Sequence, residues 1–332
     1  MKNYNILQIG LGPLGLKIAK FIAKRDGLHT IAAVDKNPSL IGQDLGLLCG
    51  GEADGILVKG SVAEAVKKKK PDVAILATVS DLGRIAPQIE EIAALGIPIV
   101  STCEELCFPW ATSPKLASRI HKAAIASNVA VLGTGVNPGY LMDALPVFLT
   151  AVCQDVKTIS VNRFQNAQFR RIPFQQKIGA GLSLEEFEKR KQDGSLRHVG
   201  LNESINLIAH RMGWKLEKTE DLISPVIAKK NIETPAMTIA KGNAAGVRQE
   251  GNGYVDGAVK IKLTFQATVG EPESYDEVII QGTPHIRSRI SGGVNGDIAT
   301  CAITLNAIPQ LLRSTPGLKT MVDIPPVSFF GG

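Results

Sequence analysis

Asn5-Ile6-Leu7-Gln8-Ile9-Gly10-Leu11-Gly12-Pro13-Leu14-Gly15 is the stretch that decides the fold of this chain. Its apolar first half predicts a short strand, and the apolar spacing over residues 16–23 predicts a helix directly after the glycines. A second predicted strand, residues 30–34, is followed by Asp35, which lies 20 residues beyond the third glycine. A strand, a Gly-x-Gly-x-x-Gly turn, a helix and a later acid in this order indicate a unit that binds a dinucleotide.

Each glycine of this turn has its own physical role. Gly10 permits the tight turn, Gly12 lets the backbone approach a pyrophosphate, and Gly15 lets the helix pack closely on the strand. Pro13 and Leu14 belong to the same turn, and the N-terminus of the helix that follows offers free N–H groups and a positive dipole end to the phosphates. We therefore expect these five residues to bind a cofactor. An ordinary glycine turn is the alternative.

The size and composition of the chain fit a globular protein of about two domains. Of its 332 residues, 44% are hydrophobic and 20% are charged. The net charge of +6 comes from dispersed basic residues, apart from Lys67-Lys68-Lys69-Lys70, so we expect no nucleic-acid partner, and an anionic small ligand fits this charge as well. No apolar run approaches the ~18 residues of a membrane span, and the five scattered cysteines predict no metal site. These features predict a reduced, cytoplasmic protein.

Strands and helices continue to alternate up to about residue 135. The predicted strands are 53–57, 72–77, 97–101 and 129–132, and the predicted helices are 62–70 and 86–95. This order predicts an α/β fold with a Rossmann-type, doubly wound parallel sheet. The four lysines end the helix at 62–70, where cations favour the dipole, so we interpret them as a solvated helix end.

After residue 135 the pattern changes to a period of two, which is typical of an antiparallel sheet with one open face. The predicted strands are 157–164, 258–269 and 276–281, and the predicted helices are 184–193, 201–212 and 299–313. We predict a dinucleotide-binding domain at 1–135 and an α+β substrate domain with a mostly antiparallel sheet at 136–298. The C-terminal helix and tail, 299–332, are expected to pack back on the first domain.

Residues that follow the predicted strands are the candidates for ligand binding, because a ligand lies beyond the carboxyl ends of an open parallel sheet. Asp35 can accept hydrogen bonds from the adenosine ribose hydroxyls, which favours NAD over NADP, and the adjacent Lys36 weakens that preference. A plain turn acid is the alternative for Asp35. Thr78 and Thr102 follow later strands, and we expect both to contact the cofactor.

Two adjacent glutamates follow the strand at 97–101. Thr102 and Glu105 have the spacing of a capping box, which gives Glu105 a structural role and leaves Glu104 available as a general base. The alternative is that both glutamates only favour the start of a helix through its dipole.

Two further segments supply candidate binding residues. Asn137-Pro138-Gly139 is a loop signal, and Asn137 either orients a carboxamide or a ribose or closes the turn. Tyr140 follows this loop, and His198 lies in loop-like surroundings of the second domain, so both are candidates for substrate contact. A structural histidine is the alternative for His198.

Five stretches that span nearly the whole chain match the motifs of a known family. They are Gly10-Leu11-Gly12-Pro13-Leu14-Gly15, Ser101-Thr102-Cys103-Glu104-Glu105-Leu106 with Pro109-Trp110, Gly133-Thr134-Gly135-Val136-Asn137-Pro138-Gly139, Arg170-Arg171-Ile172-Pro173 to Lys177-Ile178-Gly179-Ala180-Gly181-Leu182, and Gly292-Gly293-Val294-Asn295-Gly296-Asp297-Ile298-Ala299-Thr300. With these stretches the chain resembles the 2,4-diaminopentanoate dehydrogenases and the native amine dehydrogenases grouped with them, distant relatives of dihydrodipicolinate reductase. That reductase's paired-histidine loop followed by lysine is absent from the sequence.

The resemblance implies NAD- or NADP-dependent oxidative deamination of an amine carbon to a ketone with release of ammonia, or the reverse. It also implies a glutamate base, which falls on Glu104 or Glu105, and a homodimer built through the second domain. A reductase of a cyclic imine or unsaturated acid and a nucleotide-binding protein without turnover are the alternatives.

Overall fold

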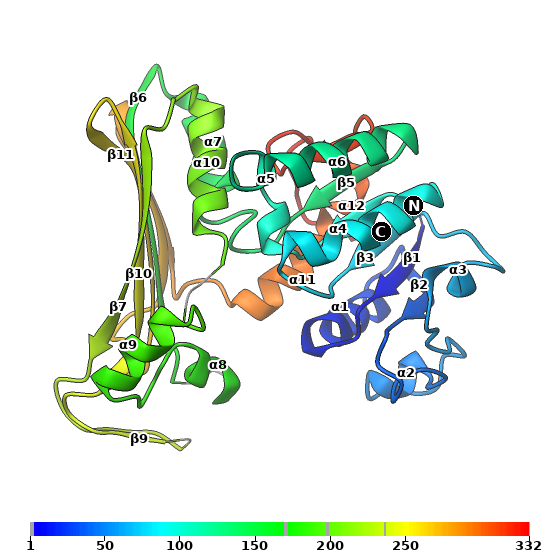
Figure 1. Cartoon of the computed structure of the whole chain (residues 1–332), viewed down its shortest axis with the longest axis horizontal. Helices are drawn as coiled ribbons and strands as arrows, with labels where there is room; N and C mark the ends of the chain where they lie inside the picture. Colours follow the sequence, from blue (N-terminus) through cyan, green and yellow to red (C-terminus); the bar gives the residue numbers. More distant parts are fainter. Residues whose placement is uncertain (1–2, 169–171, 197–198, 236, 332) are drawn as a thin grey trace. The chain divides into compact units, whose positions relative to one another are not determined.

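The computed structural model describes residues 3–168, 172–196, 199–235 and 237–331. The chain forms two compact units (Figure 1). Unit 1 is Met1–Tyr140 together with Asn295–Gly332, and unit 2 is Leu141–Val294. The chain therefore passes into unit 2 after Tyr140 and returns to unit 1 after Val294.

Unit 1 is built on a six-stranded sheet with the strand order β14-β5-β4-β3-β1-β2, and every neighbouring pair in it is parallel. The predicted doubly wound parallel sheet is confirmed. Its strands are β1 (Tyr4–Ile9), β2 (Leu28–Val34), β3 (Val73–Leu76), β4 (Ile99–Ser101), β5 (Ala130–Gly133) and β14 (Gly317–Lys319). The sequence pattern does not predict β14, because three residues are too few to show an alternation.

Helices lie on both faces of this sheet. Ala32 and Val34 of β2 share a core with α4 and α6, whereas Ala33 packs with Ala19 of α1. Because successive residues of a strand point to opposite faces, α1 covers the face opposite α4 and α6. The helices of unit 1 are α1 (Pro13–Ala23), α2 (Leu45–Leu48), α3 (Val62–Ala65), α4 (Leu82–Ala94), α5 (Pro109–Thr112), α6 (Pro114–Ala126), α11 (Gly296–Asn306) and α12 (Ile308–Leu311), with the 3-10 turn η1 (Glu104–Leu106).

The strand predicted at residues 53–57 is wrong. This segment makes only isolated bridges, which pair Leu57 with Asp44 and Lys59 with Val34. The Asp44 carboxylate accepts the N–H groups of Asp54 and Gly55 at 3.1 and 2.8 Å. A side chain therefore satisfies the backbone donors that a ladder would otherwise pair.

The helices predicted at 62–70 and 299–313 differ most from the observed ones. The helix predicted at 62–70 ends at Ala65, so the four lysines lie beyond it and not on its last turn. Lys67 and Lys70, three residues apart, would repel each other on one face of a helix, which disfavours a helix there. The helix predicted at 299–313 is divided into α11 and α12, and Pro309 in the first turn of α12 lacks the N–H that a continuous helix would need.

Unit 2 is built on a mixed six-stranded sheet with the order β13-β12-β6-β11-β10-β7. Only β6 and β11 pair in parallel among these strands of the described chain, so the predicted mostly antiparallel sheet is confirmed. The strands are β6 (Asp155–Asn166), β7 (Lys218–Ile227), β10 (Ala244–Val255), β11 (Ala258–Thr268), β12 (Tyr275–Thr283) and β13 (Ile286–Ser291), and a separate pair consists of β8 (Ile232–Glu233) and β9 (Thr238–Ile239).

One face of this sheet is apolar and carries helix α10 (Leu201–Met212). A Cβ at Gly251 or Gly253 would lie 2.9 Å from side-chain atoms of Leu201 or Ile205, so these glycines let α10 approach β10 closely. The other helices of unit 2 are α7 (Ala144–Leu149), α8 (Ile172–Lys177) and α9 (Leu184–Gln192), with the 3-10 turn η2 (Thr150–Val152). None of the described helices has the length and apolar character needed to cross a membrane.

Candidate functional site

The glycine turn between β1 and α1 has the geometry that its sequence predicts. Gly10 adopts a left-handed conformation with φ of +86°, and a Cβ there would overlap the carbonyl oxygen of Ala77. A Cβ at Gly15 would overlap the carbonyl oxygen of Gly10, so helix and turn are in direct contact at this point. A Cβ at Gly12 would meet nothing within 4 Å, which leaves the backbone there open to a ligand.

Helix α1 begins at this turn without a side-chain cap. Gly12 is its N-cap residue, Pro13 occupies the first turn, and in the described part of the chain no side-chain cap forms there. Orphan N–H groups at a helix start carry the positive end of the helix dipole and are suited to bind phosphate.

Asp35 joins the end of β2 to the glycine turn. Its Oδ2 accepts the N–H of Leu11 at 2.6 Å, and its Oδ1 accepts the N–H of Asn37 at 2.8 Å. The carboxylate is half-buried and held in one orientation beside the turn, whereas Lys36 is exposed. Each carboxylate oxygen has further acceptor capacity, so Asp35 can still accept hydrogen bonds from a ligand.

A cavity of about 760 Å³ brings together several residues that the sequence singles out. Five predicted site residues line it: Gly10, Gly12, Asp35, Lys36 and Thr78. The cavity is also lined by residues that the sequence did not predict, among them Gly60, Ser61, Val79, Arg84, Gln88 and Glu91. The last three recur at helical spacing along α4, and this periodicity is the signal that could have identified them.

The predicted capping box at Thr102 and Glu105 is wrong. Cys103 is the N-cap residue of η1, and no side-chain cap forms there. The Glu105 carboxylate instead accepts the N–H of Leu82 at 2.8 Å, at the start of α4. Glu105 therefore has a structural role, as expected, but it stabilises a helix that begins 23 residues before it.

Glu104 is half-buried and lies on the same 3-10 turn. Within the described part of the chain its carboxylate forms no hydrogen bond and no ion pair. Burial, with smaller contributions from Glu104 and Glu105, raises the pKa of the neighbouring Cys103 thiol to about 12. Cys103 is therefore an inert thiol at neutral pH, and Glu104 is the carboxylate of this turn that has no partner among the described residues.

Two hydrogen bonds hold the loop after β5 in place. The N–H of Thr134 donates to the Ser101 carbonyl at 2.9 Å, and the N–H of Val136 donates to the Thr300 hydroxyl of α11 at 3.4 Å. Asn137 is 8% exposed, and among the described residues its buried Nδ2 has no hydrogen-bond partner. An orphaned donor at the carboxyl end of a parallel strand is consistent with a ligand-binding role.

The structure gives no ligand-directed contact for the other predicted site residues that it describes, Thr102 and Tyr140. Thr102 and Tyr140 are half-buried, and Tyr140 is the last residue of unit 1 before the chain enters unit 2. His198 lies outside the described residues. Among those that are described, no group of three or more His, Cys, Asp or Glu side chains could hold a metal ion.

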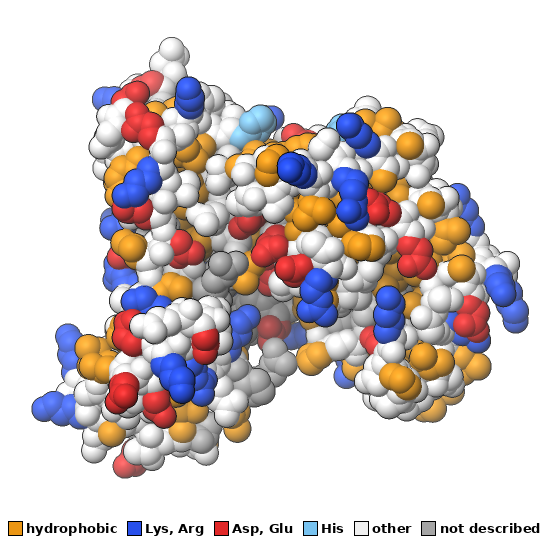
Figure 2. All heavy atoms as spheres, in the orientation of Figure 1, with side chains coloured by type: hydrophobic (Ala, Val, Ile, Leu, Met, Phe, Trp, Pro, Cys, Tyr) orange, Lys and Arg blue, Asp and Glu red, His pale blue; other side chains and the backbone are white. Residues whose placement is uncertain are grey.

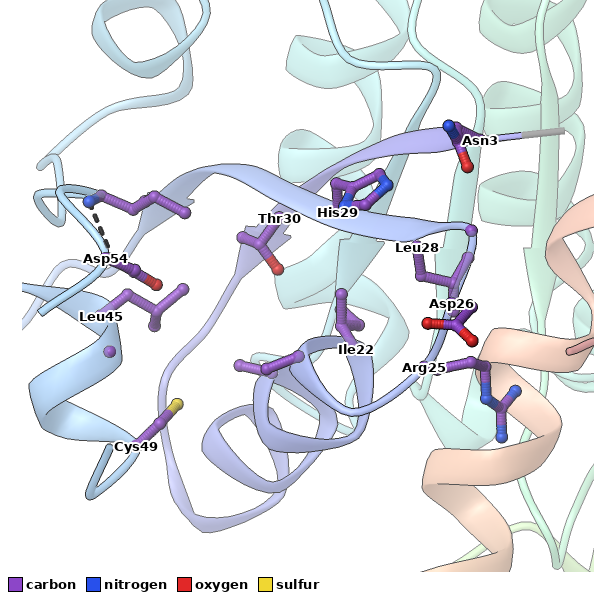
Figure 3. Close-up of a pocket in the computed structure, with 15 residues that line it drawn as sticks. Asn3, Ile22, Arg25, Asp26, Leu28, His29, Thr30, Leu45, Cys49 and Asp54 are labelled. Carbon is purple, nitrogen blue, oxygen red and sulfur yellow. Dashed lines mark hydrogen bonds between the residues drawn. The ribbon is translucent and has the colours of Figure 1, made fainter. Parts of the chain in front are cut away.

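A second cavity of about 700 Å³ lies beside α1, β2 and α2 (Figure 3). Ile22, Leu28 and Leu45 contribute apolar side chains, and Asp26 and Asp54 contribute carboxylates. The described residues that line it include none of the sequence-predicted site residues. On the surface shown in Figure 2, lysine and arginine side chains are interspersed with acidic ones, in agreement with the dispersed basic residues of the sequence.

Both halves of the chain match models of known protein families. Residues 140–330 match the family model of the 2,4-diaminopentanoate dehydrogenase C-terminal domain, and residues 1–102 match that of the CoA binding domain. The chain is 33% identical to 2,4-diaminopentanoate dehydrogenase of Acetoanaerobium sticklandii, over 98% of this chain and 94% of that protein. It is 21% identical to an amine dehydrogenase of Streptomyces virginiae, over 95% and 94% of the two chains.

Solved structures share the fold. The amine dehydrogenase from Mycobacterium smegmatis superposes with a TM-score of 0.84 at 21% identity and covers 99% of this chain and 98% of its own. Dihydrodipicolinate reductase from Paenisporosarcina sp. TG-14 superposes with a TM-score of 0.54 at 10% identity, over 96% and 98% of the two chains. The architecture is therefore common to both enzymes, with the amine dehydrogenase much nearer in shape.

Proposed function

The chain belongs to the 2,4-diaminopentanoate dehydrogenase family, and we propose that it is an NAD(P)-dependent amine dehydrogenase. It oxidises an amine carbon to a ketone with release of ammonia, and it catalyses the reverse reductive amination. The observation that carries this proposal is the half-buried Glu104 carboxylate, which has no partner among the described residues and follows a strand of a dinucleotide-binding sheet.

The residues around the glycine turn fit a nicotinamide dinucleotide. The open space at Gly12 and the uncapped start of α1 suit a pyrophosphate, and the Asp35 carboxylate suits ribose hydroxyls. When bound, the cofactor supplies the acceptor for the hydride that leaves the amine carbon.

Glu104 performs the proton transfers in this proposal. The substrate enters as an ammonium ion, and Glu104 takes its proton and releases it to solvent. The carbon of the neutral amine can then lose a hydride. The resulting iminium then needs water to add and ammonia to leave, and Glu104 takes the proton from that water and returns one to the departing nitrogen. General acid–base catalysis of this kind typically contributes roughly 10²–10⁴-fold to the rate.

A panel of amines and ketones with both cofactors tests the activity, followed by the absorbance of the reduced nicotinamide. We expect amine-dependent reduction of the cofactor and ammonia-dependent oxidation in reverse. Ketone reduction that is equally fast without ammonia would instead indicate a reductase. Cofactor binding without turnover on any amine would indicate a nucleotide-binding protein.

Asp35 and Lys36 set the choice of cofactor in this proposal. The Asp35 carboxylate repels a 2′-phosphate, and the exposed Lys36 partly offsets the repulsion. We expect a modest preference of the wild type for NAD, an Asp35→Ser shift of about tenfold toward NADP, and a Lys36→Ala shift toward NAD. One charge interaction at about 4 Å is worth roughly 1 kcal/mol in bulk water and roughly 4 kcal/mol near a protein surface, and a tenfold shift corresponds to about 1.4 kcal/mol. Steady-state kcat/KM with each cofactor measures both shifts, and a wild type that strongly prefers NADP would contradict the role of Asp35.

We propose a homodimer that forms through the sheet of unit 2. The face opposite α10 carries the stacked rings of Phe164 and Tyr275, with centroids 4.9 Å apart, and Arg289 lies 3.9 Å over Tyr275. Glu277 on this face pairs with Arg287 at 2.8 Å. Aromatic and arginine side chains of this kind are the groups that most often dominate binding between subunits.

Charge reversal at this face tests the dimer. We expect wild-type protein to be dimeric at micromolar concentration by light scattering, and Arg289→Glu to weaken the dimer at least roughly tenfold. Arg313→Glu is the matched control, because Arg313 is exposed and lies in unit 1. A monomeric wild type would disprove the proposal.

We expect the enzyme to act in the cytoplasm. All five cysteines lie in the described part of the chain, and none of them forms a disulfide. Reduced cysteines are typical of that compartment.

A further inference from the structure

Ser101 ends β4, directly before the turn that carries Glu104, and its side chain is completely buried. Its hydroxyl lies 3.0 Å from the Leu76 carbonyl oxygen on the neighbouring strand β3 and 3.2 Å from the backbone nitrogen of Cys103. Cys103 is the N-cap residue of η1, the 3-10 turn to which Glu104 belongs. The hydroxyl therefore connects the end of the parallel sheet to the start of this turn.

The chemistry of the two partners fixes the direction of both hydrogen bonds. A carbonyl oxygen only accepts, so the single hydroxyl proton of Ser101 is donated to Leu76. A backbone N–H only donates, so the hydroxyl oxygen accepts from Cys103. The Leu76 carbonyl also accepts the N–H of Thr102 at 3.1 Å, whereas the N–H of Cys103 has no second acceptor among the described residues. Loss of the hydroxyl would therefore leave the start of η1 with an unpaired buried donor.

Gly133 supports the other side of the same turn. It ends β5 and pairs with Ser101 across the sheet. A Cβ at Gly133 would lie 2.6 Å from the carbonyl carbon and oxygen of Leu106 and 2.8 Å from the backbone nitrogen of Cys107. Because these are backbone atoms, a side chain at position 133 fits only if η1 itself moves. Gly133 does not adopt a positive φ, so the close approach of η1 is the physical reason for a glycine here.

Other contacts hold η1 against the start of α4, and they do not involve the Glu104 side chain. The Cys103 thiol donates to the Ser80 carbonyl oxygen at 3.1 Å, and the Glu105 carboxylate accepts the N–H of Leu82. The Glu104 carboxylate forms no hydrogen bond and no ion pair within the described ranges of the chain. Its position is therefore determined through the backbone of the turn.

We propose that Ser101 and Gly133 are positioning residues for Glu104. The Ser101 hydroxyl fixes the start of η1, and the absence of a side chain at Gly133 lets η1 rest on the end of β5. The inference rests on the proposed function, because it assumes that Glu104 is the general base. A general base must lie within about 2.6–3.2 Å of the group whose proton it takes, and a displacement of about 1 Å can cost roughly 100-fold in rate.

Ser101→Ala and Gly133→Ala test the proposal through a separation of kcat from binding. We expect each substitution to lower kcat of oxidative deamination roughly 10- to 100-fold, with little change in the amine KM or in the dissociation constant of NADH. Ser314→Ala is the matched control, because the Ser314 hydroxyl also donates to a carbonyl, that of Leu311 at 2.7 Å, but precedes the amino end of β14. The control should retain the wild-type kcat.

The same two substitutions in a Glu104→Gln background distinguish positioning from a general structural effect. If Ser101 and Gly133 act through Glu104, neither substitution should lower kcat further once the carboxylate is absent.

Each outcome of this cycle supports or overturns the inference. A Ser101→Ala loss of the same factor in both backgrounds overturns it and leaves the proposed function intact, and so does a wild-type kcat in Ser101→Ala. A Glu104→Gln enzyme with the wild-type kcat overturns the proposed base and this inference together. If Ser101→Ala does not fold, Gly133→Ala decides the result by the same comparison.

Discussion

Glu104→Gln lowers the rate of oxidative deamination by roughly 10²–10⁴-fold, the contribution expected of a general acid–base group. The amide cannot take the proton from the substrate ammonium, so the amine carbon cannot release its hydride. Because Glu104 forms no hydrogen bond or ion pair among the described residues, its replacement should leave the melting temperature unchanged. Turnover under saturating amine and cofactor is the measurement.

Glu105→Gln is the matched control for this experiment. The Glu105 carboxylate accepts the N–H of Leu82, and the amide oxygen of a glutamine can accept the same bond. We expect near-native turnover and a small loss of stability, since a negative charge at the start of α4 contributes about 0.3–1 kcal/mol. A variant pair with the opposite behaviour, in which Glu105→Gln is inactive and Glu104→Gln is active, would assign the base to Glu105.

Gly12→Val abolishes the binding of NAD and NADP, with a loss of affinity of at least roughly 100-fold. A valine side chain would fill the space above the turn and keep the pyrophosphate from the backbone N–H groups of α1. Hydrogen bonds to a charged group are each worth about 1.5–3 kcal/mol, so the loss of two is sufficient. Titration of the variant with NADH measures the effect.

The fold should survive this substitution. Gly12 has φ of −64°, which valine adopts without strain, and a Cβ there meets nothing within 4 Å. Gly15→Val is the contrasting variant, because a Cβ at Gly15 would overlap the carbonyl oxygen of Gly10 and destabilise the turn. Near-native NAD affinity in a folded Gly12→Val variant would refute the proposed pyrophosphate site.

The sequence alone determines the elements whose signals are local. The glycine turn, the helix that follows it and the acid after β2 are predicted from residues that are close together in the chain. Helix α10 has the bounds predicted for it, because its apolar residues recur at helical spacing over three turns. The sequence also predicts the parallel and the mostly antiparallel sheet, since alternation with helices and a period of two distinguish them.

The tertiary structure decides which partner each polar side chain finds. Glu105 matches a capping box with Thr102 in the sequence, yet it bonds to Leu82, which only the approach of α4 to η1 brings within reach. Asp35 is an isolated acid in the sequence, and in the fold its carboxylate joins β2 to the N–H of Leu11.

The same holds for residues whose role depends on packing between distant segments. Gln88 contacts Thr78 only because α4 lies beside the end of β3, and β14 becomes a strand only because its edge meets β5. Periodicity, turn residues and helix caps act over a few residues, so a short stretch of sequence is enough to predict them. A hydrogen bond between segments tens of residues apart depends on where the whole sheet places its ends, and this information is absent from any local stretch of sequence.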